Sequence, residues 1–189
     1  MNILYDERVD GALPKVDKAA LLAELQRALP DLEILHRGED LKPYECDGLS
    51  AYRTTPMLVV LPERVEQVET LLKLCHQRGV PVVARGAGTG LSGGALPLEQ
   101  GILLVMARFN KILEVDPAGR FARVQPGVRN LAISQTAAPH ELYYAPDPSS
   151  QIACSIGGNV AENAGGVHCL KYGLTVHNLL KVEILTVEG

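Results

Sequence analysis

The sequence predicts a mixed α+β fold that begins with parallel strands and continues with antiparallel ones. Two observations carry this prediction: a strand–helix–strand pattern from Met57 to Ala84, and a turn sequence between two short strands from Ile112 to Gln125. The first pattern is typical of a parallel βαβ unit and the second of an antiparallel hairpin. The chain has 189 residues, 47% of them hydrophobic, so it is long and apolar enough to bury a core.

The first half of the chain alternates helices and strands. Asp17 is a predicted helix cap, and Pro30 ends the apolar stripe that follows it. Gly79 stands where a second helix must close. The predicted elements are a helix between Asp17 and Pro30, a strand over 32–35, an irregular segment over 38–55, a buried strand over 57–61, a helix over 63–77 and a strand over 80–84.

The second half predicts a change from parallel to antiparallel pairing. The turn sequence Pro117-Ala-Gly119 separates two short runs with strand character. The predicted elements are a strand over 102–106, hairpin strands over 112–116 and 121–125, a helix over 128–138 and a last long strand over 179–187.

Composition excludes several classes of protein. The net charge of −4 argues against a general binder of nucleic acid, and no apolar run reaches the length of a membrane span. Residues 1–10 carry acids where a signal peptide would be basic and then apolar. The four cysteines form no Cys-x-x-Cys pair, which indicates reduced thiols and a cytoplasmic protein.

A first glycine cluster, residues 85–94, follows the strand over 80–84 directly. Its glycines leave backbone N–H groups uncovered, and successive N–H groups form a nest for an anion such as a diphosphate. The hydroxyls of Thr89 and Ser92 add donors, and Arg85 adds a positive charge. The cluster therefore predicts a phosphate-binding loop, with a ligand-free glycine turn as the alternative.

Two other nucleotide-binding motifs do not fit this cluster. Gly88-x-Gly90-x-x-Gly93 matches the Rossmann fingerprint, but that fingerprint must open a helix. Gly94 and Pro97 occupy the place of that helix, and the next strand begins at Ile102. No Lys-Ser or Lys-Thr pair follows, so the loop is not a nucleoside-triphosphate P-loop either.

A second cluster, residues 156–166, is rich in glycine and asparagine and follows Pro146-Asp-Pro-Ser-Ser150. Amides such as those of Asn159 and Asn163 recognise neutral polar edges, for example a flavin ring or a ribose, without adding charge. Two such segments in one domain predict a cleft that holds a long dinucleotide at two places.

The ordered motifs over 81–94, 146–150, 157–166 and 171–173 resemble those of the FAD-linked oxidases of the vanillyl-alcohol oxidase and p-cresol methylhydroxylase type. Within that family they are most similar to the D-lactate dehydrogenase and glycolate oxidase branch. The resemblance implies a two-subdomain FAD-binding domain of the p-cresol methylhydroxylase type. It also implies that the sequence is C-terminally truncated, with the family's C-terminal cap domain absent.

The resemblance also implies a division of the chain and a set of cofactor-binding residues. An N-terminal helix and irregular segment take 1–52, and the FAD-binding domain takes 53–189, with a parallel half over 53–106 and a mixed antiparallel half over 107–189. The cofactor-binding residues implied are Arg85, Gly86, Ala87, Gly88, Thr89, Gly90, Leu91, Ser92, Gly93, Gly94, Pro146, Asp147, Ser149, Ser150, Gly157, Gly158, Asn163, Gly165, Gly166, Tyr172 and Gly173.

The activity that the resemblance implies is oxidation of a short 2-hydroxy acid, glycolate or D-lactate, to the 2-oxo acid. Electrons would leave through an iron–sulfur partner subunit, which could associate the protein with the inner face of the membrane. Relatives with covalent flavin often carry a His where Leu91, Ser92 and Gly93 stand here, so non-covalent FAD is expected. A non-catalytic dinucleotide-binding module is the alternative, and an NAD-dependent Rossmann dehydrogenase is disfavoured.

Other reactive side chains give weaker indications. His168 and His177 lie near the cofactor segments in sequence, but neither has an identifiable orienting partner, and no catalytic residue is assigned. Cys154, His168 and Cys169 do not have the spacing of a zinc site, so no metal is expected.

Overall fold

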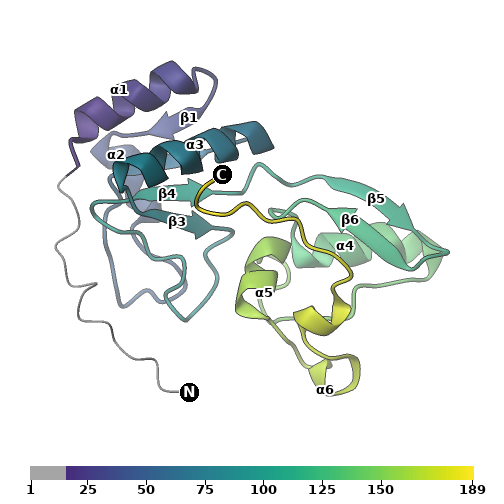
Figure 1. Cartoon of the computed structure of the whole chain (residues 1–189). Helices are drawn as coiled ribbons and strands as arrows, with labels where there is room; N and C mark the ends of the chain where they lie inside the picture. Colours follow the sequence, from purple (N-terminus) through teal and green to yellow (C-terminus); the bar gives the residue numbers. More distant parts are fainter. Residues whose placement is uncertain (1–15) are drawn as a thin grey trace, which may run out of the picture.

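The computed structural model describes residues 16–189, and the predicted absence of a signal sequence over 1–10 lies outside them (Figure 1). A four-stranded sheet, in the order β1-β2-β4-β3, forms the first part of the molecule. Strands β2, β4 and β3 are parallel, and β1 is antiparallel to β2. The elements of this part are α1 (Lys18–Ala28), β1 (Glu33–Leu35), α2 (Gly38–Leu41), η2 (Lys42–Tyr44), β2 (Leu58–Leu61), α3 (Val65–Arg78), β3 (Val82–Arg85) and β4 (Ile102–Val105).

The central strands of this sheet are buried on both faces, as their continuous apolar runs predict. On one face, Leu58 and Ile102 pack with Leu25 of α1 and Leu71 of α3. These two helices cover that face in Figure 1. On the other face, the alternate strand residues pack against Leu41 of α2. Burial in this core also raises the pKa of the Cys75 thiol on α3 to about 12.

The ends of both long helices follow the predicted signals. The carboxylate of Asp17 accepts hydrogen bonds from the backbone N–H groups of Ala19 and Ala20, at 2.9 and 3.2 Å. Gly79 ends α3 in the left-handed conformation, at φ 65°, and its N–H donates to the carbonyls of Cys75 and His76. The predicted caps are therefore confirmed.

The second part of the molecule is built on the predicted hairpin. Strands β5 and β6 are antiparallel, and the Asp116 carboxylate accepts from the Gly119 N–H within their turn. Val128, Ile133 and Ile156 form a separate small core beside this hairpin. The elements of this part are β5 (Ile112–Asp116), β6 (Phe121–Val124), α4 (Asn130–Ala137), η3 (Ala138–His140), α5 (Ile156–Glu162), α6 (Cys169–Tyr172) and η4 (Thr175–Asn178).

Three predictions about local structure are wrong. The segment 38–55 is not wholly irregular, because α2 and η2 place two helical turns there. The second glycine cluster is largely the helix α5 rather than a loop. Residues 179–187 do not form a strand, since no strand among residues 16–189 pairs with them. A strand is stable only when a neighbour satisfies its backbone groups, which a run of apolar residues alone cannot provide.

The parallel part of the fold also includes residues from the N-terminal segment 1–52 that the resemblance set apart. β1 pairs with β2 through Ile34 and Val60, and α1 contributes Leu25 to the same core. Residues before position 53 thus build one layer with those after it. The two parts of the molecule meet where β3 ends and α5 begins, and this junction positions the site described next.

Candidate cofactor site

The first glycine cluster lies at the carboxyl end of β3, a position where open α/β sheets commonly bind ligands. Residues 86–101 contain no helix, so the interpretation that this cluster is not a Rossmann fingerprint is confirmed. Gly88 and Gly93 have φ values of 69° and 78°. Residues with a side chain rarely adopt this backbone conformation, so the shape of the loop depends on glycine at both positions.

The Arg85 side chain turns away from the cleft and holds the start of the loop from outside. Its Nη1 donates to the carbonyl of Cys46 at 2.7 Å, and its guanidinium lies over the Tyr44 ring, 5.8 Å from the centroid. The sequence suggested that Arg85 adds charge to an anion site. In the structure its guanidinium contacts the 44–46 segment and does not line the cleft. The contact holds the glycine loop in place.

The 47–49 segment braces the rest of the same loop. The buried carboxylate of Asp47 accepts from the N–H of Ala95 at 3.3 Å. A Cβ atom at Gly48 would lie 2.6 Å from the carbonyl oxygen of Gly90 and 2.7 Å from that of Thr89. Only glycine permits this approach, so two backbones pack in direct contact and fix the loop.

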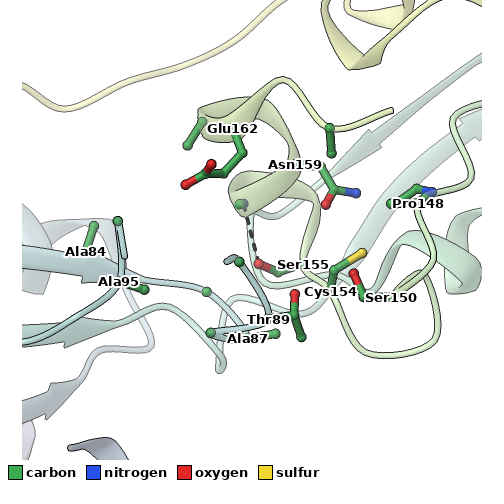
Figure 2. A pocket seen from close by; sticks show the side chains of 17 residues that line it. Ala84, Ala87, Thr89, Ala95, Pro148, Ser150, Cys154, Ser155, Asn159 and Glu162 are labelled. Carbon is green, nitrogen blue, oxygen red and sulfur yellow. Dashed lines mark hydrogen bonds between the residues drawn. The ribbon is translucent and has the colours of Figure 1, made fainter. Parts of the chain in front are cut away.

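The cleft between this loop and α5 has a volume of about 200 Å³ (Figure 2). It brings the two predicted segments together, with β3 and its loop on one side and residues 148–164 on the other. Its lining residues are Ala84, Gly86, Ala87, Gly88, Thr89, Gly90, Gly94, Ala95, Pro148, Ser150, Cys154, Ser155, Gly158, Asn159, Ala161, Glu162 and Ala164.

The lining includes only some of the residues that the sequence singled out. It contains Gly86, Ala87, Gly88, Thr89, Gly90, Gly94, Ser150 and Gly158. The others lie outside this cavity: Arg85, Leu91, Ser92, Gly93, Pro146, Asp147, Ser149, Gly157, Asn163, Gly165, Gly166, Tyr172 and Gly173.

Ser155 begins α5 and sets the width of the cleft. Its Oγ accepts from the Gly158 N–H at 3.4 Å, the dashed line in Figure 2. A Cβ atom at Gly86 would lie 2.0 Å from the same Oγ, so the glycine loop and the helix start are in close contact. Gly157 is equally crowded, because its own Cβ would lie 2.7 Å from Pro126. The glycines of the second cluster therefore serve close packing, not only open N–H groups.

Asn159, one of the two amides named in the second cluster, was not among the cofactor-binding residues that the resemblance implied. It is 4% exposed and lines the cleft, and its Nδ2 has no hydrogen-bond partner among residues 16–189. An unpaired buried amide is costly, which marks it as a group for a ligand to satisfy. The selected Asn163 instead ends α5 at φ 51°, and its Oδ1 accepts from the N–H of Val176.

Asp147 joins the 146–150 segment to the turn before α6. Its Oδ2 lies 2.6 Å from Nδ1 of His168, and its Oδ1 accepts from the His168 N–H at 3.3 Å. The hydrogen bond from the His168 side chain is the largest cause that lowers the pKa of the Asp147 carboxyl. A Cβ at Gly166 would lie 2.2 Å from the Asp147 carbonyl, so the two segments are tightly apposed. His168 thus has an orienting partner after all.

Tyr172 belongs to an aromatic cluster outside the cleft. Its ring meets that of Tyr143 edge to face, with centroids 6.1 Å apart, and Lys171 Nζ lies 4.9 Å from its centroid. A hydrogen bond with Tyr143, and then the nearby Lys171, lower the pKa of Tyr172. Tyr143 and Lys171 here stabilise a surface turn rather than a buried site.

The fold and the cleft together define a class of protein, a two-part α+β domain with a cleft between a glycine loop and a glycine-bearing helix. The chain belongs to the FAD binding domain family, whose model matches residues 56–189. The predicted family and its cofactor FAD are therefore confirmed.

Relatives of this chain are longer proteins. The chain is 73% identical to the glycolate oxidase subunit GlcD of Escherichia coli (strain K12) over all 189 residues, and it covers 38% of that protein. It is 40% identical to a D-lactate dehydrogenase of Archaeoglobus fulgidus over 132 residues, which are 70% of this chain and 29% of that one. The chain thus spans 38% and 29% of the lengths of these two curated relatives.

Solved structures confirm the predicted fold class. Alkyldihydroxyacetonephosphate synthase matches 85% of this chain with a TM-score of 0.72 and 26% identity, over 35% of its own length. p-Cresol methylhydroxylase matches 77% of this chain with a TM-score of 0.67 and 22% identity, over 29% of its own length. At that identity, the second match shows the fold alone.

None of the helices within residues 16–189 is long and apolar enough to cross a membrane. That part of the chain also holds no cluster of three or more His, Cys, Asp or Glu side chains arranged to bind a metal ion.

Proposed function

We propose that this chain is the FAD-binding portion of a flavoprotein that oxidises a short 2-hydroxy acid, glycolate or D-lactate, to the 2-oxo acid. The observation that carries the proposal is a cleft built from glycine backbone on one side and α5 on the other, in a member of the FAD binding domain family. The 73% identity to a glycolate oxidase subunit supports the choice of substrate class.

The residues of the cleft fit the diphosphate of FAD. The backbone N–H groups of 86–90 and the hydroxyls of Thr89 and Ser155 can donate hydrogen bonds to phosphate oxygens. The lining contains no Lys, Arg or His to neutralise the phosphate charge. Nests of this kind hold phosphate oxygens through hydrogen bonds and partial charges alone. The unpaired Nδ2 of Asn159 adds a buried donor that an acceptor oxygen of the cofactor can satisfy.

The cleft is smaller than a typical whole-ligand pocket of 300 Å³ or more, so it holds the central part of FAD. Some of the remaining sequence-selected positions adjoin the lining along the chain, and we assign these to the rest of the cofactor. Leu91 and Ser92 follow Gly90 in the first loop, and Asp147 and Ser149 flank the lining residues Pro148 and Ser150. We expect FAD to form no covalent bond with the first loop, because residues 86–94 contain no His, Cys or Tyr.

The chemistry that bound FAD would supply is an acceptor for the hydride equivalent from the α-carbon of the hydroxy acid. The residues of this chain bind and orient the cofactor. The lining contains hydroxyls, amides and one carboxylate, but no His, Lys or Arg that could hold the substrate carboxylate. Substrate-binding groups therefore come from outside the cleft. We propose that electrons leave to an iron–sulfur partner subunit; the name of the relative, one subunit of an oxidase, supports a partner subunit of unstated kind.

Titration of the purified chain with FAD tests the proposal directly. Binding is expected to quench flavin fluorescence, and the complex recovered by gel filtration should absorb near about 370 and 450 nm, as bound flavins do. A chain that folds by circular dichroism but recovers no flavin contradicts the proposal. Titration with NAD under the same conditions separates FAD from a nicotinamide dinucleotide.

A further inference from the structure

Glu162 places an unpaired negative charge at one end of the cleft. It is the last residue of α5 and the only charged side chain in the lining. Its Oε1 lies 2.9 Å from the position of a Cβ atom at Gly94 and 3.9 Å from that at Gly90. No hydrogen bond or ion pair engages this carboxylate within residues 16–189. The carboxylate therefore faces the far half of the phosphate-binding loop with its acceptor oxygens free.

A carboxylate at this place restricts what can lie beside it. A phosphate would be repelled, because like charges at contact distance disfavour each other. A hydroxyl group is favoured, because it donates a charge-assisted hydrogen bond to a carboxylate. In a dinucleotide, sugar hydroxyls flank the diphosphate on both sides. The part of the cleft beside Gly94, where Glu162 lies closest, is thus suited to a sugar rather than to a phosphate.

Three residues before the Glu162 acceptor, the same helix carries a hydrogen-bond donor, the amide of Asn159. Asn159 and Glu162 are three residues apart on α5, and both line the cleft. Figure 2 shows the Glu162 carboxylate and the Asn159 amide on opposite sides of α5. The buried Asn159 Nδ2 lacks an acceptor. One helix therefore offers an acceptor at one end of the cleft and a donor at the other.

We propose that Glu162 and Asn159 set the direction in which the dinucleotide lies. Glu162 accepts hydrogen bonds from sugar hydroxyls of FAD, and Asn159 donates to an acceptor oxygen of the cofactor toward the other end. The inference rests on the proposed FAD site and adds to it the selection of an unphosphorylated sugar. The hydroxyls belong either to the ribose of the adenosine half or to the ribityl chain of the flavin half.

Glu162→Gln tests the carboxylate, and the sign of the change is decisive. If Glu162 accepts from a hydroxyl, the variant binds FAD about 10-fold more weakly, the loss expected for one charge-assisted hydrogen bond. Inorganic diphosphate should bind the same variant equally well or more tightly, because a repelling charge is gone. Glu66→Gln makes the same charge change on α3, outside the lining, and should alter neither affinity.

Two smaller probes locate the hydroxyls. ADP carries only the ribose and FMN only the ribityl chain, so the probe whose affinity falls in Glu162→Gln identifies the sugar. Tighter or unchanged FAD binding in Glu162→Gln overturns the inference and leaves the proposed function intact. A wild-type chain that binds no FAD overturns both.

Asn159→Leu tests the other end with a second readout. FAD affinity should fall several-fold, while the melting temperature of the cofactor-free chain should not fall, because leucine replaces a buried donor that has no partner. If the amide serves the fold alone, the melting temperature falls and FAD affinity is unchanged. A lower melting temperature of the cofactor-free chain overturns the role given to Asn159.

Discussion

Gly88 shows how a single residue can control the cofactor loop. Its φ of 69° penalises a β-branched side chain, and a Cβ there would lie 2.5 Å from Nη2 of Arg85. Gly88→Val should therefore abolish FAD retention, because it displaces both the loop and the guanidinium that holds it. The measurement is flavin content per chain after gel filtration, with folding checked by circular dichroism.

The matched control is Gly38→Ala. A Cβ at Gly38 has nothing within 4 Å, and its backbone is not left-handed, so this variant should keep its flavin. Normal FAD content in folded Gly88→Val would show that the diphosphate does not depend on this loop.

Leu91 bears on how the flavin is attached. The side chain is 74% exposed on the first loop and has no nucleophilic atom. Acid precipitation of the loaded chain should therefore release all flavin into the supernatant. Yellow colour and fluorescence that remain with the washed, denatured polypeptide would establish a covalent bond instead.

Asp147 makes stability depend on pH. Its pKa in the folded chain is below the ordinary value because of His168, so its contribution to stability is complete above about pH 4. That contribution is lost as the pH falls through the lowered pKa. In Asp147→Asn, the free energy of unfolding should fall less steeply as the pH is lowered than in the wild type. Urea unfolding measured from pH 6 down to the lowest pH at which the chain is folded checks this. A fall as steep as that of the wild type would exclude this ion pair as its source.

At the scale of elements, the sequence was enough to predict helix ends and turns that depend on contacts between residues close in sequence. Asp17, Gly79 and the turn 117–119 act through neighbours in sequence, and each predicted element boundary near them appears in the structure. The continuous apolar strands 58–61 and 102–105 could likewise be recognised, since burial on both faces leaves no alternation.

The helix α5 was not predicted because its glycines are required by tertiary packing, which the local sequence does not show. Gly157 is required by contact with Pro126, and the helix is held by Ser155 as its cap and by packing of Ile156. A sequence with two adjacent glycines argues for a loop when only intrinsic propensity is considered. Once the helix is assigned, the spacing of Asn159 and Glu162 on it follows, and so does the place of Glu162 in the lining, which the sequence did not indicate.

At the scale of the whole molecule, cofactor binding and catalysis are separable. The lining of the cleft has no base beyond Glu162, and His168, bound to Asp147, has a side chain that is 63% exposed and outside the cavity. Oxidation requires a clamped carboxylate and a positioned base. This 189-residue chain, loaded with FAD, should therefore not be reduced by glycolate or D-lactate under anaerobic conditions. Bleaching of the flavin absorbance above the buffer control would place the catalytic groups within these residues.

The unpaired stretch over 179–187 has a consequence for handling the protein. Leu180 and Ile184 are 82% and 74% exposed, and neither proline nor glycine interrupts the run. Exposed extended segments of this kind are templates for pairing between molecules. Concentrated solutions should therefore self-associate, with a sedimentation coefficient that rises with protein concentration. Ile184→Lys should reduce that rise, because the added charge disfavours pairing of residues 179–187 between molecules.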